Sequence, residues 1–250
     1  MSDEVSSADP PVRPKARKGK GSRRYFADPA KAAVWAEIRA RTDWAADQQR
    51  KGFWITYLIR DPRFRDKKGQ PGLPIYVGQT NDFAERVFSR FNGCEKEAIK
   101  LGKDCVEKRV ADLLHLGIVA TYQVLSYQPT HLSSLVSETN MALECWNRGY
   151  DLANNAKLQN GPGPRITRDD IPKRWIWDRF TLSEAAQDNI LVEVRCAACR
   201  SALRISAERF RGTRRPPNKL KEIETDPMWN DEPCTDCGAL GRRSLALHLA

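Results

Sequence analysis

Four cysteines in the C-terminal part of the chain are spaced so that they could hold one metal ion. They form two Cys-x-x-Cys pairs, Cys196 with Cys199 and Cys234 with Cys237. A gap of two residues lets both thiolates of one turn reach the same ion, and two such turns give the tetrahedral four-cysteine site that Zn²⁺ takes in zinc ribbons. The strand-like run 190–194 leads into the first pair and supports this arrangement. We therefore expect Zn²⁺ at these cysteines, with a disulfide or a redox use as the alternative.

A second residue that could bind a metal ion lies on a predicted helix that either Thr130 or Ser133 can cap and that runs to Arg148. At about 100° per residue, Glu138 falls on the same stripe as Leu135 and Ala142. Glu144 falls on the opposite, polar face. Carboxylates are almost never fully buried unless they are paired or bind a metal ion. From the helix alone, Glu138 is therefore equally a metal ligand or the partner of an arginine in a structural salt bridge.

Two tyrosines precede this helix on a predicted β-hairpin. The runs 53–60 and 73–80 are rich in β-branched and aromatic residues, which is typical of strands, and they carry Tyr57 and Tyr76. A glycine turn and an Asn-Asp pair follow, and these are typical of the start of a helix. That helix contains Arg86.

The order of these residues resembles the GIY-YIG nuclease superfamily, which has two tripeptides on neighbouring strands, a helix with a catalytic arginine, and a downstream glutamate and asparagine. Here the tripeptides are Ile55-Thr56-Tyr57, which lacks the glycine, and Tyr76-Val77-Gly78. The resemblance covers residues 52–155. It implies catalytic roles for Tyr57, Tyr76, Arg86, Arg90, Glu138 and Asn154. Arg90 stands where family members often carry histidine or tyrosine, and either Asn154 or Asn155 supplies the asparagine.

The resemblance implies hydrolysis of phosphodiester bonds by a single Mg²⁺ or Mn²⁺. Together with the upstream tyrosines and Arg86, it makes Glu138 the expected metal ligand. Arg86 can grip a non-bridging oxygen with its planar donor fork. A tyrosine hydroxyl can orient or deprotonate the attacking water, and the sequence leaves open whether Tyr57 or Tyr76 does so. We expect a site-specific DNA endonuclease, of the restriction type before the homing type.

The elements that must position these residues indicate an α+β fold. Strands at 53–60, 73–80 and 118–127 predict a small three-stranded antiparallel sheet flanked by helices. The connection 61–72 contains two prolines and two glycines, so we expect it to lack regular structure. The predicted helices cover residues 28–49, the segment that begins at Asn81 or Asp82, 95–116 and 130–148.

Composition divides the chain into four parts. Residues 1–26 are basic and almost free of apolar side chains, which predicts a disordered arm. The nuclease-like domain covers 27–160, and a Gly-Pro-rich connecting segment covers 161–188. The last part, 189–250, is expected to be a zinc-ribbon-like module that binds nucleic acid. Its two cysteine pairs are separated by a basic insertion.

Charge and the remaining cysteines suggest the partner and the compartment. The net charge of +10 suits a polyanion, and we expect double-stranded DNA before RNA, with a homodimer if the target is palindromic. The odd total of seven cysteines argues against a closed disulfide framework, and Cys94, Cys105 and Cys145 are expected to be buried thiols. No apolar run approaches the roughly 20 residues needed to span a bilayer, and the N-terminus lacks the apolar core of a signal peptide. We therefore expect a cytoplasmic protein that does not bind membranes.

Two alternatives stay open at this point. One is a non-catalytic, zinc-containing protein that binds DNA or regulates, which keeps the hairpin only as a scaffold. The other concerns the zinc module alone, because structural zinc ribbons bind proteins as well as DNA.

Overall fold

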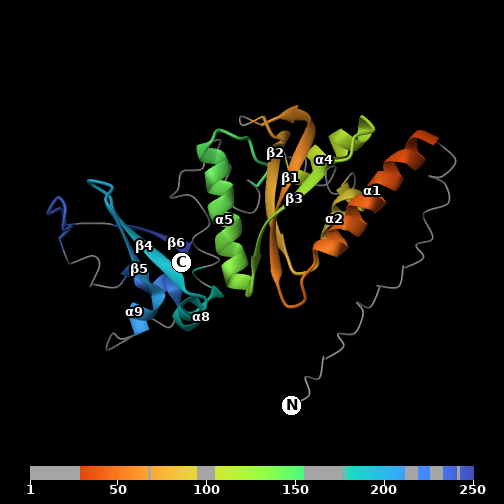
Figure 1. The fold of residues 1–250 in the computed structure, drawn as a ribbon. Helices are drawn as coiled ribbons and strands as arrows, with labels where there is room; N and C mark the ends of the chain where they lie inside the picture. The colour runs from red at the N-terminus through yellow and green to blue at the C-terminus, as the bar shows by residue number, and fades with distance from the viewer. Residues whose placement is uncertain are drawn as a thin grey trace, which may run out of the picture.

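The computed structural model describes residues 29–66, 69–94, 105–154, 177, 179–211, 219–225, 233–240 and 243–250. These residues form an α+β structure with two three-stranded antiparallel sheets and surrounding helices. Helix α5 (His131–Asn147) lies between the two sheets (Figure 1). The predicted α+β class and the small three-stranded antiparallel sheet are confirmed. The predicted basic arm 1–26 lies outside the described residues.

The first sheet has the order β2-β1-β3, with β1 (Trp54–Arg65) in the centre. Strand β2 (Pro71–Thr80) and strand β3 (Thr121–Gln128) pair with it on either side, both antiparallel. The expectation that 61–72 would lack regular structure was wrong, because β1 and β2 continue through most of that segment. Shifts in the pairing register after Ile59 and after Asp61 accommodate the prolines, which cannot donate a hydrogen bond to the ladder.

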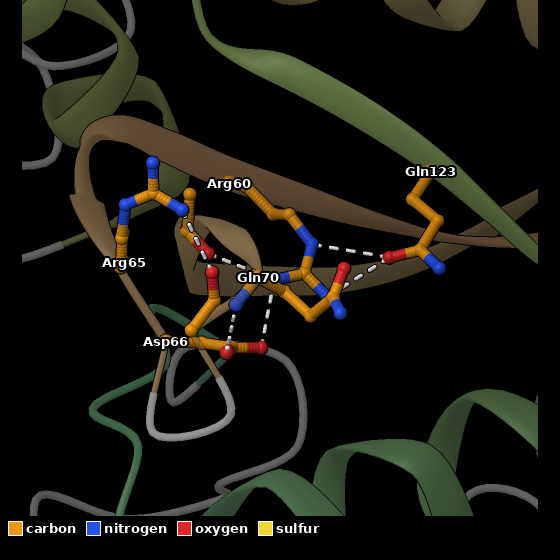
Figure 2. A network of polar contacts seen from close by, with 7 residues as sticks. Arg60, Arg65, Asp66, Gln70 and Gln123 are labelled. Carbon is orange, nitrogen blue, oxygen red and sulfur yellow. Dashed lines mark hydrogen bonds and ion pairs between the residues drawn. The ribbon is translucent and has the colours of Figure 1, made fainter.

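Side-chain hydrogen bonds hold the extended hairpin together. Figure 2 shows Arg60 between Gln123 of β3 and Asp66 at the hairpin tip. The Arg60 guanidinium donates to the Gln123 side-chain oxygen at 2.9 and 3.1 Å, and to the Gly72 carbonyl at 2.8 Å. Asp66 accepts from the Gln70 backbone N–H at 2.8 Å. These contacts stabilise the hairpin, because proline and glycine give this segment a low intrinsic strand propensity.

Three helices pack around the first sheet on the side away from α5. They are α1 (Pro29–Gln48), α2 (Phe83–Asn92) and α4 (Val106–His115). Asp82 caps α2, because its carboxylate accepts from the Glu85 backbone N–H at 3.0 Å. The predicted helix over 95–116 is described only from Val106 onward. None of the described helices is both long and apolar enough to cross a lipid bilayer.

The second sheet has the order β5-β4-β6 and its own helices. Its strands are β4 (Ile190–Cys196), β5 (Ala202–Ser206) and β6 (Arg243–Leu249). Helices α8 (Leu182–Gln187) and α9 (Ala207–Arg211) and the 3₁₀ helix η2 (Leu220–Thr225) lie beside it. The described part of the predicted connecting segment includes Trp177, Phe180 and α8, and these residues belong to the core of the second sheet.

Candidate functional site

Tyr57 of β1 and Tyr76 of β2 lie side by side in the core between the first sheet and helices α1, α2 and α4. They are 1% and 5% exposed, and their ring centroids are 6.4 Å apart. Tyr57 stands opposite Gly78 in the strand register. A Cβ on Gly78 would lie 2.7 Å from the Tyr57 hydroxyl oxygen and 2.6 Å from the Tyr76 ring, closer than side-chain atoms approach. Glycine at position 78 is therefore what lets the Tyr57 ring lie across β2.

Two arginines on α2 face this pair of tyrosines at different depths. Arg90 is buried, and its Nη2 donates to the Tyr76 hydroxyl at 3.4 Å. Its guanidinium carbon lies 5.2 Å from the Tyr76 ring centroid, and Glu107 of α4 forms an ion pair with it. A buried guanidinium needs such a counter-charge, because an unpaired charge in a core is very costly. Arg86 lies one turn earlier and is half-buried.

The electrostatics of the site keep both tyrosines protonated. Burial raises the pKa of Tyr57 and the pKa of Tyr76, because the phenolate would lose its hydration. The charges of Arg90 and Arg86 lower these pKa values in part, and Glu138 raises them. Both hydroxyls are thus hydrogen-bond donors at neutral pH. Deprotonating either one requires further positive charge beside it.

Glu138 occupies the position on α5 that its helical spacing predicts. It is half-buried, whereas Glu144 is exposed and pairs with Arg148 on the same helix. The influence of the Glu138 carboxylate on both tyrosines places it within electrostatic range of their hydroxyls. The charges of one acid on α5 and two arginines on α2 therefore act on the two tyrosines of β1 and β2.

Asn154 acts on the backbone of β2. Its side chain is buried, accepts from the Val77 N–H at 2.9 Å and donates to the Val77 carbonyl at 2.6 Å. Both polar groups of the residue between Tyr76 and Gly78 are thereby satisfied by one amide. Asn154 fixes the strand that carries the second tyrosine. Asn155 lies outside the described residues.

Sequence reasoning missed two residues of this site. Glu107 forms the ion pair with Arg90, and nothing in its local sequence indicates that partner. Tyr122 packs its ring 6.1 Å from that of Tyr57, and its hydroxyl is buried with no hydrogen-bond partner among the described residues. Strand alternation could have suggested Tyr122, because it lies in the third predicted strand on the face of the sheet that carries Tyr57.

The second candidate site is the group of four cysteines that the sequence predicts. Their thiol sulfurs all lie within 4.8 Å of one another, and among the described residues they are the one such group of three or more metal-ligating side chains. The Cys196 and Cys237 sulfurs are 3.8 Å apart, and the Cys199 and Cys234 sulfurs 3.7 Å. Sulfurs held about 2.3 Å from one ion in a tetrahedron lie about 3.8 Å apart. All four are free thiols, so the geometry fits an ion and not a pair of disulfides.

The two cysteine turns have the same backbone form. The Arg200 N–H donates to the Cys196 carbonyl at 3.0 Å, and the Gly238 N–H donates to the Cys234 carbonyl at 2.8 Å. The residue after each pair has a left-handed conformation, with φ of 62° at Arg200 and 68° at Gly238. These tight turns point both thiols of a pair in one direction. The first joins β4 to β5 and the second comes shortly before β6.

Ser201 adjusts the acidity of two of the thiols. Its hydroxyl lies 3.0 Å from the Cys199 sulfur and 3.5 Å from the Cys234 sulfur. Hydrogen bonding to Ser201 is the main cause that lowers the pKa of Cys199. Together with backbone N–H groups of Asp236 and Cys237, it lowers the pKa of Cys234 to about 6. The thiolate form, which is the form that binds metal ions, is favoured at these two positions.

Comparisons with protein-family models, with curated proteins and with solved structures found no match. The function is therefore inferred from the side chains of the two sites and from the charge of the chain.

Proposed function

We propose that this protein is a metal-dependent DNA endonuclease of the GIY-YIG type that hydrolyses phosphodiester bonds, with Zn²⁺ at the four cysteines. The observation that carries the proposal is that the charges of Arg86, Arg90 and Glu138 all act on the buried hydroxyls of Tyr57 and Tyr76, and that Arg90 also donates to Tyr76. Separate strands and helices supply these residues, in the order expected from the resemblance. If these residues served only to pack the core, apolar side chains at the same positions would cost less free energy to bury.

The side chains present fit a divalent cation of the Mg²⁺ type. Glu138 offers a hard oxygen ligand and is half-buried. Mg²⁺ at phosphoryl sites is held by one or two carboxylates, with water and substrate phosphate completing its shell. When bound, Mg²⁺ or Mn²⁺ would polarise the phosphate and stabilise the leaving oxygen.

Each residue of the chain then has a task in the proposed reaction. The planar guanidinium of Arg86 donates hydrogen bonds to a non-bridging phosphate oxygen. Arg90 donates to Tyr76 and lowers the pKa of both tyrosines against the effect of burial. A tyrosine hydroxyl orients the attacking water. Where enough positive charge gathers for that tyrosine to release its proton to solvent, the resulting tyrosinate accepts a proton from the water. Asn154 holds β2 in place while this occurs.

Charge supports DNA as the substrate. The chain carries a net charge of +10, and the second sheet adds Arg195 and Arg204, which both donate to the buried Glu193 carboxylate. Each guanidinium uses some of its N–H donors for Glu193 and has further N–H groups that can bind a phosphate. We propose the second sheet as a reader of a specific double-stranded site, in an enzyme of the restriction type that acts as a homodimer if the site is palindromic.

The test is cleavage of mixed plasmid and phage DNA by the purified protein with Mg²⁺ or Mn²⁺. Glu138→Gln should abolish cleavage and leave DNA affinity nearly intact, because the carboxylate binds the metal ion and not the DNA. Glu144→Gln, on the same helix but exposed, is the matched control and should cleave normally. Reactions without added divalent cation replace a chelator control, since a chelator would also remove zinc. Discrete fragments would support a site-specific enzyme, and cleavage by Glu138→Gln would refute the assigned role.

A second function has one observation in its favour. Tyr57 and Tyr76 are almost fully buried, as they would be in a scaffold that has no catalytic work. In that case the chain would be a zinc-containing protein that binds DNA or regulates without cleaving it. Salt-sensitive DNA binding without cleavage under any of these conditions would favour this function.

A further inference from the structure

Helix α5 contributes side chains to two different hydrophobic cores. Its first two turns place Leu132, Leu135 and Val136 in the core of the second sheet. Its later turns place Ala142 and Cys145 in a small core against the first sheet. The second-sheet core also contains Trp177, Phe180, Ile190, Val192 and Leu245, and the small core contains Leu58, Val77, Tyr150 and Leu152. The two sheets therefore share one helix, which Figure 1 shows between them.

The second sheet together with α8, α9 and η2, called the second unit below, also fixes the start of α5. Thr130 caps the helix by accepting from the Ser133 backbone N–H at 3.1 Å. The same Thr130 hydroxyl donates to the carboxylate of Asp188, the residue that caps the C-terminal end of α8. One hydroxyl thus joins the first turn of α5 to the last turn of α8.

A stack of three rings joins both units at the same point. The His131 ring lies against Trp54 of β1, with centroids 4.2 Å apart and planes 19° apart. On its other side it meets Phe180 edge to face, with centroids 5.9 Å apart. The first residue of α5 is therefore held between the first sheet and the second-sheet core.

Glu138 lies between these two sets of attachments. It follows Val136, which belongs to the second-sheet core, and precedes Ala142, which belongs to the core against the first sheet. The rotation and height of α5 at Glu138 depend on both cores, since side-chain direction changes by about 100° for each residue. We propose that the second unit is a positioning element for Glu138, and that zinc binding at the cysteines supports the geometry of the tyrosine site. This inference rests on the proposed function for the role of Glu138.

The experiment compares amide hydrogen exchange in the full chain before and after zinc is removed from the cysteines. If the second unit holds α5, removal should raise exchange at least tenfold in β4 and also in the first half of α5. The amides of α1, on the far side of the first sheet, serve as the internal control and should change little. Faster exchange in β4 with no change in α5 would overturn the proposal.

Two substitutions keep the test decisive if zinc removal unfolds the whole chain. Asp188→Ala removes the contact with Thr130 and should raise exchange in the first turns of α5. Asp112→Ala, at an exposed position on α4, is the matched control. Val136→Ala, on α5 itself, should in turn raise exchange in β4. If Asp188→Ala raised exchange only in the second unit and Val136→Ala raised it only in α5, the proposal that the two units support each other through α5 would be refuted.

A metal-binding measurement separates this inference from the proposed function. Mn²⁺ affinity should fall about tenfold in Asp188→Ala and should be lost in Glu138→Gln. If Glu138→Gln still binds Mn²⁺ and cleaves DNA, the metal-binding role of Glu138 is refuted, and if the parent protein does not cleave DNA at all, the proposed function fails. The exchange result would then still decide whether the two units share α5 as a common support.

Discussion

The two candidate sites are built in opposite ways. The cysteine site consists of two local turns, and two of its four residues, Cys199 and Cys237, are exposed. The tyrosine site draws its residues from four elements, and both hydroxyl-bearing rings are buried. At the cysteine site, short-range spacing brings the two ligands of each pair together, and the fold has only to bring the two turns together. At the tyrosine site, only the finished fold does so.

This difference determines what holds each site in place. The cysteine turns have backbone hydrogen bonds within themselves, but they contribute little apolar surface, so a bound ion would supply much of their stability. The tyrosine site is supported by packing, by the Asn154 amide and by the pairing of Arg90 with Glu107. A change at the first site should therefore act through metal affinity, and a change at the second through packing and charge.

The largest effect is expected from breaking the cysteine site. Cys196→Ser replaces a buried thiolate ligand by a hydroxyl that binds Zn²⁺ poorly. The purified protein should hold one Zn²⁺ per chain, and the variant should lose the zinc together with the folded second sheet. Metal analysis and thermal unfolding measure both. Cys145→Ser, at a buried thiol outside the group, should keep its zinc; equal zinc loss in both variants would contradict the assignment.

The next largest effect concerns the charge pair at the tyrosine site. Glu107→Gln leaves the Arg90 guanidinium buried without its counter-charge, which should cost about 3 kcal/mol of unfolding free energy. Urea unfolding measures this value. Asp112→Asn, exposed on the same helix, should stay within about 0.5 kcal/mol of the parent. Replacing Arg90 by glutamine in the Glu107→Gln background should recover part of the loss, and full additivity of the two changes would disprove the coupling.

Much of the tyrosine site could be predicted because its pieces carry local signals. Helical spacing separated the half-buried Glu138 from the exposed Glu144, and strand patterns placed Tyr57 and Tyr76 on neighbouring strands. Glu107 could not be found in this way, because it meets Arg90 only when α2 and α4 pack together.

The extended hairpin and the shared helix could not be predicted for related reasons. Proline and glycine in 61–72 argue for a loop, and the structure overrides this with the Arg60 hydrogen bonds across the sheet. The apolar residues of α5 were visible in the sequence, but periodicity does not tell which core each part of the helix enters. Each cysteine pair needed no such information, since its turn is local.

Gly78→Ala tests the packing of the tyrosine site directly. The added methyl group would lie within 2.7 Å of both tyrosine rings, which are held by their neighbours and cannot move freely. We expect a loss of about 2 kcal/mol in unfolding free energy and a severe loss of cleavage. Gly93→Ala is the matched control, because its Cβ would meet nothing closer than 3.4 Å. If Gly78→Ala were as stable as Gly93→Ala, the close approach of the rings would be wrong.

A smaller effect is expected in the pH dependence of stability. Burial opposes ionisation of Glu193, but hydrogen bonds from Arg195 and Arg204 and the charge of His248 outweigh it and lower its pKa. A carboxylate with a lowered pKa in the folded state adds stability above its unfolded pKa of about 4.3, and this stability is lost as the pH falls below that value. Unfolding measured from pH 6 to pH 3 should therefore show a shallower acid loss in Glu193→Gln than in the parent. Parallel curves would show that Glu193 is not the group responsible.

The smallest expected effect is a gain in stability, at the first cysteine turn. Arg200 has a φ of 62°, which an L-residue with a Cβ adopts only with strain, whereas the equivalent position of the second turn is Gly238. Arg200→Gly should stabilise the zinc-loaded protein by up to about 1 kcal/mol, offset in part by the greater freedom of glycine in the unfolded chain. Gly238→Ala should destabilise it by a similar amount. Because the two turns have the same backbone form, changes of the same sign in both variants would mean that the turns are not equivalent.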